Sequence, residues 1–278
     1  MSGEASPWRP EQYEKFRDER SAPFFDLLAL VQACPGGRVV DLGCGTGELT
    51  RELHAKTQSA ETVGIDSSET MLAKSDPFAG NGLRFERADI EAFAPERPFE
   101  VVFSNAALQW VNGHEELLQQ VSGYVADDGQ LAVQVPANDD HPSHVIAHQL
   151  AAEEPFRSAL GGYVRDWPVR SPEWYAALLD RLGYRDQHVR LQVYGHHLES
   201  AEGVIEWVKG TLLTDYEKRM SPELWQEYLR QYREALLPRL IHDSRVTIHD
   251  SRFTIHDSNG PARPYFYAFK RILMWGRR

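Results

Sequence analysis

The stretch VVDLGCGTGE, residues 39–48, decides the fold of this chain. An apolar run that ends in an acid and opens into alternating glycines predicts a buried strand, a tight loop and then a helix. Gly43, Gly45 and Gly47 permit backbone angles that are closed to other residues, and their missing side chains let a ligand lie against the main chain. The loop therefore predicts a cradle for a nucleotide or nucleoside.

The details of the loop indicate which ligand it holds. A dinucleotide fingerprint has the spacing G-x-G-x-x-G, whereas this loop has G-x-G-x-G. Asp41 stands before the loop, where its carboxylate would repel an anion and suit a cation. The next strand, residues 62–66, ends in Asp66, where a carboxylate can accept both hydroxyls of a ribose. These features predict a positively charged nucleoside without phosphates, S-adenosylmethionine, as the cofactor.

The composition narrows the class of protein. The 278 residues carry a formal net charge of −11, which disfavours nucleic acid and anionic lipid as partners. Only Cys34 and Cys44 are present, so we expect no disulfide framework and no paired-cysteine zinc site. The start of the chain lacks a signal-peptide pattern, and no run of about twenty apolar residues occurs. We expect a soluble, cytoplasmic protein, either a monomer or a weak homo-oligomer.

Strand and helix patterns alternate around the loop. Residues 83–87, 99–104 and 129–135 carry strand patterns, and residues 48–56 and 113–124 carry helical ones. This alternation predicts an α/β fold with a parallel sheet and helices on both faces. Beyond Pro136 the pattern changes, and two insertions are expected to form a helical lid above the cofactor.

A seven-residue repeat, IHDSRVT-IHDSRFT-IHDS, fills residues 241–258. A coiled coil needs more heptads with two apolar positions each, and the central Asp-Ser favours turns. Translation of a tandem ATTCACG unit through its three frames gives Ile-His-Asp-Ser-Arg-Phe-Thr. We therefore predict a DNA-repeat insertion that forms a mobile loop without a structural role, because surface loops tolerate added length.

Four segments together resemble the class I methyltransferases. They are VVDLGCGTGELT (39–50), VGIDSSETML (63–72), RADIEAF (87–93) and FEVVFSNAALQWV (99–111). More narrowly, SNAALQWV (104–111), the opening segment 8–28 and VIEWVKGTLLTDY (204–216) resemble the trans-aconitate 2-methyltransferase family. The resemblance implies a Rossmann-like, seven-stranded, mostly parallel sheet whose last strand, residues 265–275, is antiparallel.

The resemblance also implies one methyltransferase domain over residues 1–278. We expect its core in residues 35–138, 171–198 and 262–278, and its helical cap in residues 1–30, 139–170 and 199–240.

The cofactor residues follow partly from the strand ends and partly from the family. Asp41 is expected near the methionine end with the loop backbone, and Asp66 at the ribose. Met71 is a candidate for packing on adenine, although a methionine at helical spacing is more often part of a core. The resemblance adds Trp8 and Tyr13 over the cofactor, an acid and an apolar residue at the adenine, and the end of the fourth strand beside the sulfur. The full expected set is Trp8, Tyr13, Asp41, Gly43, Cys44, Gly45, Gly47, Asp66, Ser67, Met71, Asp89, Ile90, Asn105 and Ala106.

The family implies a carboxylate acceptor such as trans-aconitate. A carboxylate is ionised at neutral pH, so no general base and no catalytic residue is needed, and catalysis reduces to positioning the acceptor and excluding water. A tricarboxylate needs cations and hydrogen-bond donors. The candidates for binding it are Gln109, Trp110, His114, Arg165, Arg170, Trp174, Tyr175, Trp207, Thr211 and Arg271, of which the tryptophans are equally compatible with a core.

The sequence leaves other functions open. The acceptor could be another small metabolite, or a carboxylate on a carrier protein, which would need a basic docking patch. The chain could also sense S-adenosylmethionine without catalysis, or bind NAD, although the glycine spacing disfavours NAD. His144 and His148 are four residues apart, but no H-E-x-x-H pattern accompanies them, so no metal is expected.

Overall fold

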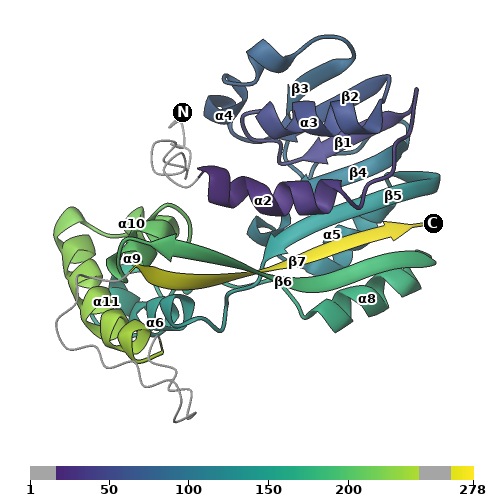
Figure 1. Ribbon diagram of the computed structural model, residues 1–278. Coiled ribbons are helices and arrows are strands. Elements are labelled where there is room, and N and C mark those ends of the chain that lie inside the picture. Colours follow the sequence, from purple (N-terminus) through teal and green to yellow (C-terminus); the bar gives the residue numbers. More distant parts are fainter. Residues whose placement is uncertain (1–16, 244–263) are drawn as a thin grey trace. The chain divides into compact units, whose positions relative to one another are not determined.

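The computed structural model, which describes residues 17–243 and 264–278, confirms the predicted alternation of strands and helices (Figure 1). Two expectations concern residues outside this description. Trp8 and Tyr13 precede it, and most of the repeat at 241–258 lies in the gap.

A seven-stranded sheet forms the centre of the fold, in the order β3-β2-β1-β4-β5-β7-β6. The pairs from β3 to β5 are parallel, and β7 runs antiparallel to β5. The predicted Rossmann-like, mostly parallel sheet with an antiparallel last strand is therefore confirmed. The strands are β1 (Arg38–Leu42), β2 (Glu61–Asp66), β3 (Leu83–Arg87), β4 (Phe99–Asn105), β5 (Val125–Pro136), β6 (Asp186–Leu198) and β7 (Tyr265–Arg277).

Helices cover both faces of this sheet, as predicted. Phe103 of β4 meets Phe24 of α2 (Arg17–Leu28) with ring centroids 5.3 Å apart. Its neighbour Val102 belongs to a buried cluster that includes Leu117 and Val121 of α5 (His114–Ser122). Because successive strand residues point to opposite faces, α2 and α5 lie on different sides of the sheet. The other elements around it are α3 (Glu48–Thr57), α4 (Glu69–Leu72), the short turns η1 (Asp76–Phe78) and η2 (Leu108–Trp110), and α8 (Pro172–Arg181).

The order of the strands predicts where a ligand binds. Strand β1 is flanked by β2 on one side and by β4 on the other, so the chain direction across the sheet reverses there. In open α/β sheets, ligands bind beyond the carboxyl ends of the strands at such a reversal. The glycine loop leaves the carboxyl end of β1 at this position.

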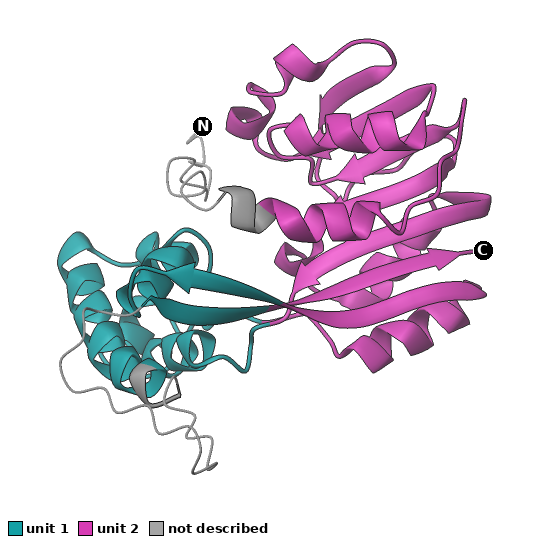
Figure 2. Ribbon diagram, viewed as in Figure 1, with its two compact units in different colours: residues 1–17, 138–166, 194–269 teal, residues 18–137, 167–193, 270–278 magenta. Residues whose placement is uncertain are grey.

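The chain divides into two compact units (Figure 2). Unit 2 comprises Asp18–Ala137, Trp167–Val193 and Lys270–Arg278, and it contains the glycine loop. Unit 1 comprises Met1–Arg17, Asn138–Asp166 and Tyr194–Phe269. The long strands β6 and β7 contribute residues to both units. The expectation that the insertions cover the cofactor stays a prediction.

Unit 1 has its own core, which is rich in aromatic residues. The Tyr228 and Tyr232 hydroxyls donate to the carbonyls of Ala147 and Ser143, each at 2.8 Å, and these bonds join α11 to α6. Trp207 is 2% exposed and lies against the His196 ring at a centroid distance of 4.9 Å. The helices of this unit are α6 (Pro142–Ala151), α7 (Phe156–Ala159), α9 (Glu202–Lys209), α10 (Thr214–Glu217) and α11 (Pro222–Asp243).

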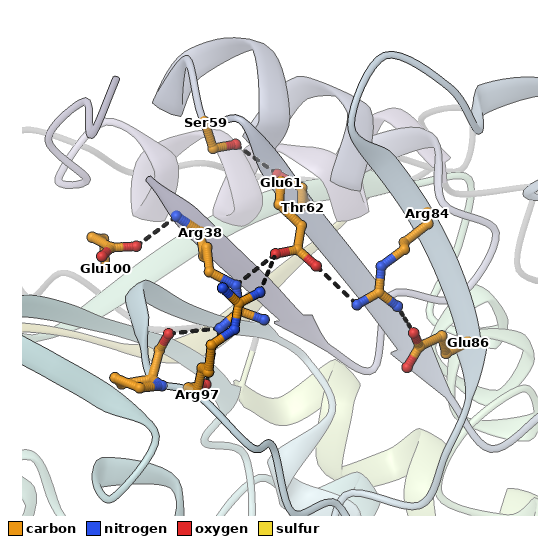
Figure 3. A network of polar contacts seen from close by, with 9 residues as sticks. Arg38, Ser59, Glu61, Thr62, Arg84, Glu86, Arg97 and Glu100 are labelled. Atoms are coloured by element: carbon orange, nitrogen blue, oxygen red, sulfur yellow. Dashed lines mark hydrogen bonds and ion pairs between the residues drawn. The ribbon is translucent and has the colours of Figure 1, made fainter. Parts of the chain in front are cut away.

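A network of arginines and glutamates joins the strands near their amino ends (Figure 3). Glu61, the first residue of β2, accepts from Arg38 Nε at 2.5 Å and from Arg84 Nη2 at 3.0 Å. These hydrogen bonds hold the pKa of Glu61 below its ordinary value. Such partly exposed pairs stabilise a fold modestly. The network lies at the opposite end of β1 and β2 from the glycine loop, so it takes no part in the site described next.

Candidate active site

Three glycines of the loop adopt left-handed backbone angles, but they serve different purposes. A Cβ atom at Gly43 (φ +82°) would overlap the Cβ of Ala107. At Gly47 (φ +76°) a Cβ would stand 2.6 Å from the Phe85 ring. At Gly45 a Cβ would meet, within 4 Å and apart from its chain neighbours, only Met71 Cε at 3.3 Å among the described residues. Packing therefore requires glycine at Gly43 and Gly47, and Gly45 is the open position of the loop.

The Asp66 carboxylate is fixed beside this loop. Its Oδ2 atom accepts the N–H of Gly45 at 2.9 Å, and its Oδ1 atom accepts the N–H of Ser68 at 2.8 Å. Each carboxylate oxygen has a further lone pair for a ligand. Burial raises the pKa of Asp66, while the two N–H donors act in the opposite direction. The two hydrogen bonds therefore fix the orientation of the carboxylate at the end of β2, and its remaining lone pairs can accept hydrogen bonds from a ligand.

Asp41 is more deeply buried than Asp66. Its side chain accepts a 2.7 Å hydrogen bond from the Thr50 hydroxyl of α3, a partner that the sequence analysis missed. Burial, opposed by the Thr50 hydrogen bond and aided by the negative charge of Asp66, raises the pKa of Asp41 to about 7. Because the charge of Asp66 opposes the ionisation of Asp41, a cation placed near both carboxylates would favour the charged form of Asp41.

The end of β4 is strained. Ala106 has φ +55°, which is uncommon for a residue with a side chain and is found at functional sites. Its N–H donates to the Gln134 carbonyl at 2.9 Å, and its carbonyl accepts from Gln109 Nε2 at 2.6 Å. Within the described part of the chain, the buried atoms Asn105 Oδ1 and Gln109 Oε1 have no hydrogen-bond partner. This strand end therefore presents two unsatisfied acceptors.

The other expected cofactor residues separate into three groups. Ile90 and Met71 lie beside the loop, because Ile90 Cδ1 would be 3.8 Å from a Cβ at Gly43 and Met71 Cε adjoins Gly45. Asp89 and Ser67 are exposed, and Asp89 accepts the N–H of Glu91 at 2.9 Å. Cys44 is buried, its N–H donates to Ile65, and burial raises the pKa of its thiol, so the thiol is unreactive.

His114 and Tyr175, two of the residues expected to bind the acceptor, pair with each other inside the protein. His114 Nε2 is 3.0 Å from the Leu108 carbonyl, and its Nδ1 pairs with the Tyr175 hydroxyl. The Tyr175 hydroxyl also accepts the backbone N–H of Arg170 at 3.1 Å. Burial lowers the pKa of His114, which favours the neutral form of the ring. Both ring nitrogens are engaged and both side chains are buried in unit 2, and the expected contact of this pair with the substrate stays a prediction.

The remaining acceptor candidates are spread over both units. In unit 1, Trp207 is a core residue, Thr211 is half-buried, and Arg165 is buried 3.9 Å from Asp215. In unit 2, Trp110 and Trp174 are half-buried, and the Arg170 side chain is exposed. Arg271 of β7 is 7% exposed and donates from Nη1 to Gln134 Oε1 at 3.2 Å. Of the two candidate cations in unit 2, Arg271 is therefore buried and Arg170 is exposed.

Comparisons with known proteins identify the family. Residues 13–193 match the model of a methyltransferase domain. A trans-aconitate 2-methyltransferase from Deinococcus radiodurans is 40% identical over 277 residues, which are 98% of each chain. Another from Streptomyces avermitilis is 37% identical over 85% of this chain and 90% of its own. The chain belongs to the trans-aconitate 2-methyltransferase family.

Solved structures agree with the methyltransferase fold. The YcgJ protein from Bacillus subtilis has a TM-score of 0.55 at 13% identity, over 92% of this chain and 97% of its own. A phosphoethanolamine N-methyltransferase from Haemonchus contortus, solved with S-adenosylhomocysteine, has a TM-score of 0.53 at 12% identity, over 98% of this chain and 58% of its own.

The cofactor of this methyltransferase is S-adenosylmethionine, and the site fits it. The position at Gly45 is open, and Asp66 has lone pairs left for hydroxyl groups. Asp41 and Asp66 favour the positive charge that the cofactor carries on its sulfonium and ammonium groups. When bound, S-adenosylmethionine supplies an electrophilic methyl group. Among the described residues, no group of three metal-ligand side chains and no helix able to span a membrane occurs.

Substitution of Asp41 by asparagine is expected to stabilise the fold and weaken cofactor binding. Between pH 4 and about 7, the folded protein keeps a proton on Asp41 that the unfolded chain has already released. The free energy of unfolding therefore falls as pH rises through this window. Asp41→Asn should therefore exceed the wild type in free energy of unfolding at pH 8, by at most about 4 kcal/mol. The difference should vanish below pH 4.

Urea denaturation across this pH range measures the first effect, and calorimetric titration measures the second. Wild-type affinity for S-adenosylmethionine should fall as pH drops below about 7, because protonation removes the charge of Asp41. The Asp41→Asn variant should show weaker and pH-independent binding. Equal affinity in both proteins at pH 8 would show that Asp41 does not act on the cofactor.

Proposed function

We propose that this enzyme transfers the methyl group of S-adenosylmethionine to a carboxylate oxygen of trans-aconitate. The observation that carries the proposal is the relative named trans-aconitate 2-methyltransferase, which aligns with 98% of this chain and 98% of its own. Two further relatives from different bacteria bear the same name at 38% and 37% identity.

The chemistry of a carboxylate acceptor agrees with the side chains around the loop. Such an acceptor is already ionised at neutral pH, so the protein needs no general base. His114, the histidine nearest to the end of β4 in sequence, has both ring nitrogens engaged inside the protein. The task left to this chain is to hold two reactants in one orientation and to exclude water, which can supply a large part of a rate enhancement.

The residues take the following proposed roles. Asp66 binds the ribose hydroxyls, and Asp41 stabilises the positive charge of the cofactor. Gly45 with Met71 and Ile90 forms the apolar side of the nucleoside site, and Asp89 meets the adenine amine. Asn105 and Ala106 lie beside the sulfur, where the Asn105 Oδ1 atom has acceptor capacity free. Gln109 and Arg271 remain the candidates for the acid.

The proposed acceptor is a free small molecule in the cytoplasm. Cys34 and Cys44 are both free thiols, which agrees with a reducing compartment.

A methyl-transfer assay tests the function. The purified full chain is incubated with S-adenosylmethionine and, separately, with trans-aconitate, citrate and fumarate, and mass spectrometry follows the formation of a methyl ester. We expect the monomethyl ester of trans-aconitate as the fastest-forming product. If S-adenosylhomocysteine binds but none of the acids is methylated, the cofactor assignment stands and the acceptor assignment is wrong.

A further inference from the structure

A buried amide and a buried cation lie together near the carboxyl end of β5. Gln134 is 0% exposed, and Arg271 on the neighbouring strand β7 is 7% exposed. Arg271 Nη1 is 3.2 Å from Gln134 Oε1. No pattern in the sequence indicates a role for Gln134, because a glutamine in an apolar strand belongs to no motif.

The contact with Arg271 fixes which way the amide points. A guanidinium group can only donate hydrogen bonds, so the amide atom that faces it must be the oxygen. The Nε2 atom of Gln134 therefore points elsewhere, and within residues 17–243 and 264–278 it is buried without a hydrogen-bond partner. A buried donor that lacks an acceptor is costly, and a bound ligand can supply the missing acceptor.

The register of the strands places this amide next to the cofactor site. Gln134 pairs with Asn105 on β4, and Arg271 pairs with Pro136, two residues further along β5. Paired residues on neighbouring strands share a face of the sheet, so Asn105, Gln134 and Arg271 lie on one face. The Gln134 carbonyl also accepts the N–H of Ala106.

Direct contacts connect the glycine loop, the strained residue Ala106 and Gln134. Ala107, the residue after Ala106, packs against Gly43 of the loop. The assigned cofactor residues occupy the ends of β2, β1 and β4, and Gln134 and Arg271 follow on the next two strands of the sheet.

We propose that Gln134 Nε2 and the Arg271 guanidinium together bind a carboxylate of the acceptor acid. This inference rests on the proposed function and assigns part of its acceptor site. Both groups are donors, and guanidinium and amide N–H groups match the two oxygens of a carboxylate. A carboxylate whose lone pairs are engaged by such donors is a poor nucleophile. The pair therefore holds a carboxylate that is not methylated, and it selects acids with more than one carboxylate.

The test measures binding of trans-aconitate to the complex with S-adenosylhomocysteine by calorimetry. In Gln134→Met the dissociation constant for trans-aconitate should rise about tenfold to a hundredfold, with unchanged affinity for S-adenosylhomocysteine. Gln134→Glu keeps the bond to Arg271 but replaces the donor by a negative charge, so its loss should be larger. In methyl-transfer kinetics the effect of Gln134→Met should appear in KM more than in kcat.

Gln130 supplies a matched control on the same face of β5. Its Oε1 accepts from the Gln32 N–H and from Trp275 Nε1, and its Nε2 donates to the Gln32 carbonyl, so all its roles are internal. Gln130→Met should lower the unfolding temperature without changing the affinity for trans-aconitate. Any methyl transfer to crotonate, whose one carboxylate must then lie at the methyl group and not at Gln134, should proceed at the same rate in wild type and Gln134→Met.

Two outcomes separate this inference from the proposed function. If the wild type binds and methylates trans-aconitate, but Gln134→Met and Gln134→Glu bind it as tightly as the wild type does, the carboxylate site at Gln134 is wrong and the function stands. If the wild type neither binds nor methylates trans-aconitate, the proposed function itself fails.

Discussion

Replacing Asp66 with alanine is expected to weaken binding of S-adenosylhomocysteine by about tenfold to a hundredfold. The carboxylate accepts the N–H groups of Gly45 and Ser68, and its remaining lone pairs are assigned to the ribose hydroxyls. Alanine removes both functions at once, because it frees the loop and leaves the hydroxyls without acceptors. Asp66→Asn keeps one acceptor oxygen and should lose less.

Calorimetric titration of the purified variants measures this effect, and thermal unfolding of the ligand-free variants is its control. Burial opposes the charge of Asp66, so the Asp66→Ala variant should unfold at nearly the wild-type temperature while its affinity for S-adenosylhomocysteine falls. An unchanged affinity for S-adenosylhomocysteine in Asp66→Ala would show that the ribose site has been assigned to the wrong residue.

Replacing Gly43 with alanine is expected to lower the free energy of unfolding by about 2–5 kcal/mol. The new Cβ would occupy the space of the Ala107 Cβ, and the backbone angle of +82° disfavours any side chain. The neighbouring strand ends are closely packed, so the overlap between the two Cβ atoms can be removed only if the end of β4 shifts. Loss of this magnitude would leave a domain of ordinary stability marginally folded.

Two variants separate the clash from the backbone angle. Gly36 has a similar angle, +76°, but a Cβ there meets nothing within 4 Å among the described residues, so Gly36→Ala should lose only about 1–2 kcal/mol. Adding Ala107→Gly to Gly43→Ala should recover part of the lost stability. Urea denaturation measures all four proteins, and equal losses in Gly36→Ala and Gly43→Ala would refute the proposed packing.

The sequence predicts the sheet well because its signals are local. The third strand, residues 83–87, is found with its predicted bounds, and the predicted helix 48–56 differs by one residue at its end. Apolar runs bounded by glycine and acids identify buried strands, and the parallel order follows from their alternation with helices. Asp41 and Asp66 could be placed for the same reason, since each lies at or near the end of such a strand.

The partners of these residues could not be predicted in the same way. Thr50 of the helix after the loop donates to Asp41, and Ala107, just after β4, packs against Gly43, just after the neighbouring strand β1. Such contacts depend on how separate elements pack against one another, and no spacing rule indicates them. Gln134 gave no signal either, because its importance comes from a buried neighbour on another strand.

The burial of the acceptor candidates could not be predicted from the sequence. His114, Tyr175 and Trp207 were chosen because their side chains suit a ligand, yet each is buried in a core. Aromatic and histidine side chains serve in cores as readily as in binding sites, because their polar atoms can be satisfied internally. Arg271 differs from them because its guanidinium group contacts Gln134, a buried amide on the neighbouring strand.

The most direct test of this account is a calorimetric titration of the full chain with S-adenosylhomocysteine, followed in the same sample by trans-aconitate. We expect that the nucleoside binds in a one-to-one complex and that trans-aconitate then binds to that complex. Failure of S-adenosylhomocysteine to bind would contradict the cofactor site built from Gly45, Asp41 and Asp66, and binding of the nucleoside without the acid would contradict the proposed acceptor.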